Sequence, residues 1–217
     1  TVNYIGSYAF YDCNSMTSIN IPNGIERIKS HTFYGCAALQ NIETPNSVVA
    51  IEDYAFYGCV VAKTITISNS CEEIGEAAFY NCKAVEELII PDSVKSIGDY
   101  AFRSCVEVTE LRFSDNIETL GASAFYDCNA LESVYLGKKI IELKDNLFYG
   151  CSKLQSITLP STLEKIGDSA FEECNALTSL SIPANVTYIG QNALGNCTEL
   201  TTLVLPFLGS SAHTAPN

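Results

Sequence analysis

Cysteine recurs along this chain at a fixed interval, and this interval limits the possible fold more than any other feature of the sequence. Nine of the ten cysteines lie 23 residues apart without a single insertion or deletion: Cys13, Cys36, Cys59, Cys82, Cys105, Cys128, Cys151, Cys174 and Cys197. A period of roughly 20 to 29 residues, with Leu and Ile at set positions, indicates a solenoid that adds one strand and one turn per repeat. The sequence therefore predicts about nine stacked turns, and function must be sought on an extended surface.

The copies share the pattern I-G-x-x-A-F-x-x-C-x-x-L-x-x-I-x-I-P-x-x-V-x-x, which in the fourth copy runs from Ile74 through Cys82 and Pro91 to Val94. This pattern resembles the leucine-rich repeats of the BspA type, also seen in Treponema surface proteins, over roughly residues 1–206. The resemblance implies an α/β repeat solenoid of the leucine-rich-repeat class, right-handed, with a parallel concave β-sheet and short helical or irregular turns on the convex side. It also implies an extracellular or cell-surface protein of a bacterium, or a similar protein of a mucosal parasite.

Both ends of the chain depart from the repeat. Residues 1–5 begin in the middle of a repeat, so we expect residues 1–206 to be a fragment of a leucine-rich repeat domain. The repeat register is lost at Phe207, and the Ser- and Ala-rich residues that follow are typical of linkers. We therefore interpret residues 207–217 as a C-terminal cap or a linker to a missing module.

Each recurring position of the repeat has an expected packing role. In the seventh copy, strand alternation points Ile157 and Leu159 inward and Thr158 outward. Proline follows the strand in six copies and ends the ladder because it has no backbone donor. Glycines such as Gly75 and Gly98 are expected to permit a tight turn. The phenylalanines are expected to stack as one buried column: Phe10, Phe33, Phe56, Phe79, Phe102, Phe125, Phe148 and Phe171.

The cysteines allow two interpretations. Neighbouring turns about 4.8 Å apart would place them within disulfide range. However, Cβ vectors at one position of the repeat run parallel, so we expect free thiols that behave as small buried apolar residues. A zinc site is less expected, because such sites need clustered Cys and His ligands and the only histidines are His31 and His213. We expect no metal and no cofactor.

Charge and motifs exclude several classes of function. The chain has 25 acidic and 12 basic residues, a net charge of −13, which argues against nucleic acid or an anionic membrane as ligand. No stretch approaches the roughly 18 apolar residues of a membrane-spanning helix. The repeats have no insertion to host catalytic groups, and no nucleophile or phosphate-binding motif occurs. We therefore expect a monomeric binding protein without membrane insertion and without enzymatic activity.

A candidate binding patch emerges where outward strand positions are compared. Most of these positions carry small polar residues, but the middle copies bring an aliphatic residue, an arginine and a tyrosine together within an acidic rim: Glu86, Glu87, Ile89, Glu110, Arg112, Glu132 and Tyr135. Aromatic and Arg residues ringed by charge are typical of protein-binding hot spots. The alternative is a solvated face on which Arg112 pairs with a glutamate across the ladder.

A second stripe follows the phenylalanines and consists of Tyr11, Tyr34, Tyr57, Tyr80, Arg103, Tyr126, Tyr149, Glu172 and Gly195. We expect these tyrosines to cover the convex core with their hydroxyls toward water, although such a ladder could also grip carbohydrate. For the whole chain we expect adhesion through a host or bacterial surface protein bound on the concave face. The alternatives are a passive stalk that displays another domain, or glycan recognition by the tyrosine stripe.

Overall fold

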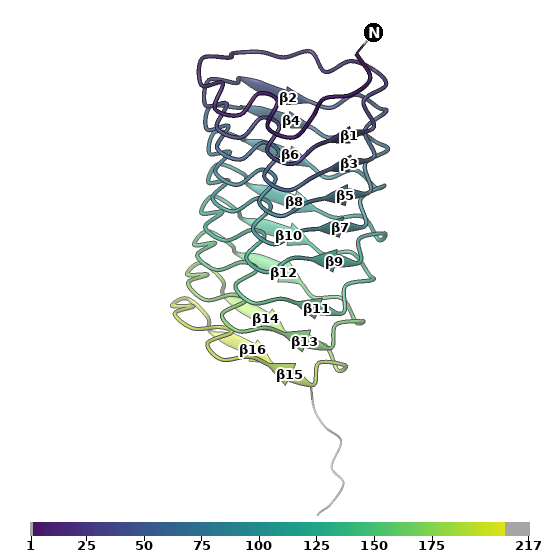
Figure 1. Cartoon of the computed structure of the whole chain (residues 1–217). Coiled ribbons are helices and arrows are strands. Elements are labelled where there is room, and N and C mark those ends of the chain that lie inside the picture. The colour runs from purple at the N-terminus through teal and green to yellow at the C-terminus, as the bar shows by residue number, and fades with distance from the viewer. Residues whose placement is uncertain (1, 207–217) are drawn as a thin grey trace, which may run out of the picture.

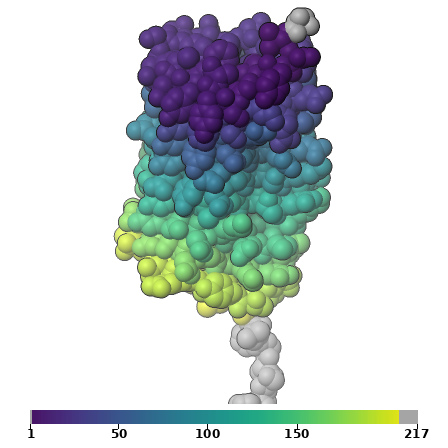
Figure 2. Space-filling model, in the orientation of Figure 1, coloured from purple at the N-terminus to yellow at the C-terminus, as the bar shows by residue number. Residues whose placement is uncertain are grey.

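Residues 2–206 form a column of stacked turns in which strands of two lengths alternate along the chain (Figure 1). The structure is a computed structural model and describes these residues. The cap or linker predicted for residues 207–217 lies outside them. Figure 2 shows successive turns as bands across the surface, in chain order from one end of the column to the other.

The three-residue strands form the ladder that the repeat pattern predicts. Within each of the three sheets that they form, they pair in parallel with the strand one repeat away, so that Ile42 lies opposite Ile65. Their middle residue is buried in every strand except the last, as the alternation of side chains requires. The strands are β2 (Asn41–Glu43), β4 (Thr64–Thr66), β6 (Glu87–Ile89), β8 (Glu110–Arg112), β10 (Ser133–Tyr135), β12 (Ser156–Thr158), β14 (Ser179–Ser181) and β16 (Thr202–Val204).

Two-residue strands form a second parallel ladder, which the sequence did not lead us to predict. Its strands end immediately before the glycine position of the repeat. Five of them make one continuous sheet in the order β1-β3-β5-β7-β9, and three more make a second sheet. The strands are β1 (Arg27–Ile28), β3 (Ala50–Ile51), β5 (Glu73–Ile74), β7 (Ser96–Ile97), β9 (Thr119–Leu120), β11 (Glu142–Leu143), β13 (Lys165–Ile166) and β15 (Tyr188–Ile189).

The number of turns that contribute strands is one fewer than predicted. Within residues 2–206 there are eight strands of each length, because the first copy contributes a turn but no strand. Gln40 N still donates to Thr17 O over 3.1 Å, so the first copy remains attached to the ladder at this point.

The turns on the far side from the strands are irregular, and the predicted short helical turns are wrong for residues 2–206. Their backbone donors alternate: Phe102 N donates to Ala124 O of the next repeat over 2.9 Å, whereas Cys105 N donates to Phe102 O over 3.2 Å. Each turn also contains residues in the left-handed region, such as Ser104 with φ 61°. Left-handed residues interrupt a right-handed helix, so each turn bonds partly to its neighbour.

The glycines that follow the two-residue strands have a different role from the one predicted. Gly98 and Gly121 do not have positive φ, so the expected tight turn does not explain them. A Cβ atom on Gly121 would lie 2.2 Å from the carbonyl carbon of Gly98 and 2.3 Å from Asp99 N. At Gly121 the backbone therefore touches that of the preceding repeat, and the absence of a side chain leaves room for this contact.

The predicted column of phenylalanine rings is confirmed and forms the centre of the core. From Phe10 to Phe171, adjacent ring centroids lie 5.0 to 5.9 Å apart and the rings are nearly parallel. All of these rings except that of Phe10 are fully buried. We call this stack the Phe column.

The cysteines form a second column beside the Phe column, and all ten are free thiols, as expected. Along the column, Sγ donates a hydrogen bond to the carbonyl oxygen of a phenylalanine one repeat earlier, as in Cys82 to Phe56 at 3.4 Å and Cys151 to Phe125 at 3.3 Å. A thiol is a weak donor on a small apolar side chain, so it suits this narrow position. Burial raises the pKa of Cys105 to about 12.

This arrangement predicts slow thiol chemistry. Eight cysteines are buried, so thiol titration of the native protein should show rapid reaction at Cys13, which is exposed, slower reaction at the partly exposed Cys197, and about ten reactive groups after denaturation. A set of disulfides in non-reducing mass spectrometry would contradict the column of free thiols.

Candidate functional site

An open groove of about 790 Å³ lies on the three-residue ladder, centred on β6 and β8, and we call it the β6–β8 groove. Side chains from three consecutive repeats line it. The ones used below are Glu86, Glu87, Ile89, Asp92, Glu110, Arg112, Asp115 and Tyr135. Ile89 is 63% exposed, although it is as apolar as the residues of the core.

The groove coincides with a break in the ladder. Strands β2, β4 and β6 form one sheet and strands β8, β10 and β12 another, so β6 and β8 lie side by side without ladder hydrogen bonds. Glu87 and Glu110 occupy equivalent positions 23 residues apart, and like charges directly opposite each other destabilise strand pairing. The ladder is also broken between β12 and β14, where no such pair occurs, so charge alone does not explain both breaks.

Arg112 stacks on an aromatic ring at one side of the groove. Arg112 and Tyr135 are register partners on β8 and β10, and the guanidinium carbon lies 4.6 Å from the centre of the tyrosine ring. This distance is that of a cation–π contact. Arg112 forms no salt bridge within residues 2–206, so the ion pair with a glutamate that formed part of the alternative prediction is absent there.

Lys138, one repeat after Asp115, pairs with this lining aspartate. Lys138 Nζ lies 2.6 Å from Asp115 Oδ2, and the Tyr135 hydroxyl donates to Asp115 Oδ1 over 3.4 Å. The hydrogen bond from Lys138 holds the pKa of the Asp115 carboxyl below its usual value. Asp115 therefore holds the Tyr135 hydroxyl while Arg112 covers the ring.

Six of the seven residues predicted for the binding patch line this groove, and one does not. Glu132 is exposed but is not among the lining residues. Asp92 and Asp115 were missed, although they occupy one position of the repeat, just after the strand. A comparison of this column along the sequence, as was done for the strand positions, would have found two consecutive aspartates.

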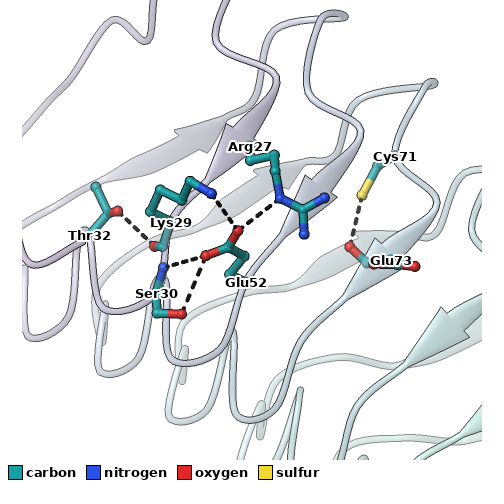
Figure 3. A network of polar contacts seen from close by, with 7 residues as sticks. All are labelled: Arg27, Lys29, Ser30, Thr32, Glu52, Cys71 and Glu73. Carbon is teal, nitrogen blue, oxygen red and sulfur yellow. Dashed lines mark hydrogen bonds and ion pairs between the residues drawn. The ribbon is translucent and has the colours of Figure 1, made fainter. Parts of the chain in front are cut away.

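A second polar cluster lies on the two-residue ladder and has a structural role (Figure 3). The Glu52 carboxylate accepts hydrogen bonds from Arg27 Nε at 2.8 Å, Lys29 Nζ at 3.0 Å and the backbone N of Ser30 at 3.1 Å. Partial burial opposes ionisation, but these bonds outweigh it and hold the pKa of Glu52 below its usual value. Both carboxylate oxygens of Glu52 thus accept hydrogen bonds from within the fold, and these bonds link the first strands of this ladder.

The tyrosine stripe forms a second aromatic stack on the outside of the turns, which we call the Tyr column. Ring centroids of Tyr34 and Tyr57 lie 4.5 Å apart with nearly parallel planes, and Tyr126 stacks on Tyr149 in the same way. Arg103 fills the gap, with its guanidinium carbon 4.0 Å from the Tyr126 ring centre. Because the rings within the stack cover one another's faces, mainly ring edges remain for a ligand there. This geometry favours the packing role over carbohydrate binding, which uses free ring faces.

The structure also bears on other kinds of site. Over the described part of the chain, no helix is long and apolar enough to cross a bilayer. Residues 2–206 likewise bring together no group of three or more His, Cys, Asp or Glu side chains that could hold a metal ion.

Comparisons with known proteins agree with the architecture. The chain matches the family described as the BspA type leucine rich repeat region at residues 3–132 and 119–212. No curated protein matches it.

Three solved bacterial structures illustrate the likeness. A leucine-rich repeat protein of T. pallidum has 29% identity and a TM-score of 0.71, with 79% of this chain and 81% of that chain covered. A leucine-rich cell surface protein from Faecalibacterium prausnitzii has 28% identity and a TM-score of 0.61, with coverage of 97% and 65%. A leucine-rich repeat protein from Eubacterium ventriosum has 30% identity and a TM-score of 0.72, with coverage of 82% and 48%.

Proposed function

The chain belongs to the family of BspA-type leucine-rich repeat proteins, and on that basis we propose that it is a protein-binding module of a bacterial cell surface. Its fold is that of a binding scaffold, with a rigid core that presents long rows of side chains to a partner. We propose that it acts in adhesion, by holding a surface protein of a host or of a neighbouring bacterium. The cell-surface description of the Faecalibacterium relative supports this location.

The observation that carries the proposal is the composition of the β6–β8 groove. The groove combines an exposed aliphatic side chain, Ile89, with the stacked pair of Arg112 and Tyr135. Tyr and Arg are the residues most enriched among interface hot spots, and a groove lets a partner bury them on several sides. The rest of the ladder presents mainly small polar side chains, so this groove is the best candidate contact on that face.

We expect Tyr135→Ala to weaken partner binding by about 1–3 kcal/mol, as loss of an anchor residue does. The partner would first be captured from extracellular host proteins and bacterial surface proteins with the immobilised wild-type chain. Its affinity for the wild type and the variant would then be compared by surface plasmon resonance. Ser181→Ala, on the exposed face of β14, is the matched control and should change the affinity little.

Two results would count against the proposal. Equal affinity of the wild type and Tyr135→Ala, with unchanged melting curves, would exclude the β6–β8 groove as the contact. Failure to capture any partner that saturates at micromolar concentration would favour the passive stalk.

A further inference from the structure

The groove carries negative charge that the described chain does not neutralise. Its five carboxylates are opposed by one lining cation, Arg112. Asp115 is paired with Lys138. The other four form no salt bridge within residues 2–206: Glu86, Glu87, Asp92 and Glu110. Glu52 on the other ladder shows that this chain pairs a carboxylate with cations elsewhere.

The one cation that lines the groove is held away from these carboxylates. Arg112 shares strand β8 with Glu110, but its guanidinium lies over the Tyr135 ring. This stack keeps a positive charge at the side of the groove and leaves its acidic centre open. Arg112 could otherwise pair with these carboxylates in place of a cation from the partner. Its stacking on Tyr135 prevents that pairing.

An apolar contact lies beside the free carboxylates. Ile89 follows Glu87 by two residues on β6, so both side chains point outward from the same strand. A ligand that places an apolar group on Ile89 brings its neighbouring side chains within reach of Glu87 and Glu110. These neighbouring side chains of the ligand should be positively charged, because opposite charges across an interface favour association.

We infer that the partner bound at this groove presents an extended polypeptide segment in which a lysine or arginine adjoins an apolar side chain. This inference rests on the proposed function and specifies the partner chemistry of the same site. The basic side chain lies among Glu86, Glu87 and Glu110, and the apolar side chain covers Ile89. Arg112 remains on Tyr135 and does not contact the partner's cation.

Three fluorescein-labelled octapeptides test the inference by fluorescence anisotropy. One alternates lysine and leucine, one replaces every lysine with glutamate, and one replaces every leucine with serine. The lysine–leucine peptide should bind the wild-type chain best, and its affinity should fall as salt rises from about 50 to 300 mM, because screening weakens exposed charges. The glutamate–leucine peptide should show no saturable binding.

Variants then locate the contact. The double variant Glu87→Gln/Glu110→Gln removes two charges and should lower the affinity for the lysine–leucine peptide roughly five-fold or more. This follows from a loss of about 0.5 kcal/mol of binding free energy per exposed charge. The control Glu142→Gln/Glu164→Gln removes two exposed charges that line no part of this groove and should change affinity less than two-fold.

The outcomes separate this inference from the proposed function. Saturable binding of the glutamate–leucine peptide that is lost in Arg112→Gln would overturn the basic partner and leave the groove as a protein-binding site. Equal loss of affinity in the control and the groove double variants would overturn a specific contact and indicate attraction by net charge. No saturable binding of any peptide would also overturn the inference, while the captured partner and Tyr135→Ala still decide the proposed function.

Discussion

Phe79→Ala should lower the free energy of unfolding by roughly 3–5 kcal/mol, the usual cost of removing a buried phenylalanine ring. Phe79 is fully buried in the middle of the Phe column, with ring centroids 5.4 Å from Phe56 and 5.1 Å from Phe102. The cavity would lie between two rings that the backbone ladders hold in place on either side, so the surrounding structure cannot easily collapse into it. Thermal and urea denaturation measure the effect.

The neighbouring residue supplies the control for this experiment. Tyr80 is only partly buried in the Tyr column, so Tyr80→Ala should cost much less than Phe79→Ala. If Tyr80→Ala proved the more damaging change, the assignment of the Phe column as the centre of the core would be wrong.

Gly121→Ala should destabilise the fold by at least about 3 kcal/mol, at the upper end of the range for overpacked sites. The added methyl group would meet the backbone of Gly98 and Asp99 at 2.2 to 2.5 Å, and backbone atoms cannot move aside as a flexible side chain can. Two repeats would have to separate, which breaks the hydrogen bond from Gly121 N to Ile97 O at 2.8 Å.

The same position in the first copy offers a matched control. A Cβ atom on Gly6 would contact only the Tyr4 side chain, at 3.6 Å or more, so Gly6→Ala should change the melting temperature little. Equal effects of the two substitutions would show that glycine is needed for the local turn and not for the close approach of neighbouring repeats.

Much of the candidate site followed from counting positions along the repeat. A strict period of 23 residues places equivalent residues side by side, so the sequence alone predicts Ile89, Arg112 and Tyr135 as neighbours. The period also makes Asp92 and Asp115 neighbours, but they lie beyond the strand, where alternation does not predict the direction of a side chain. The groove itself depends on the break between β6 and β8, which no single position of the repeat specifies.

The period, the parallel register, the buried Phe column and the free thiols follow from the sequence alone, because all of these depend only on which residues recur at equal intervals. The backbone hydrogen bonds of the turns and the contact partner of each side chain become visible only in the tertiary structure. The turns contain no helix in residues 2–206 because their backbone donors bond to the next repeat, as Phe102 N does. Gly121 is required by the backbone of another repeat, and Arg112 prefers the Tyr135 ring to a glutamate. These contacts join atoms of neighbouring repeats, and the spacing of residues along the sequence does not specify the distances between such atoms.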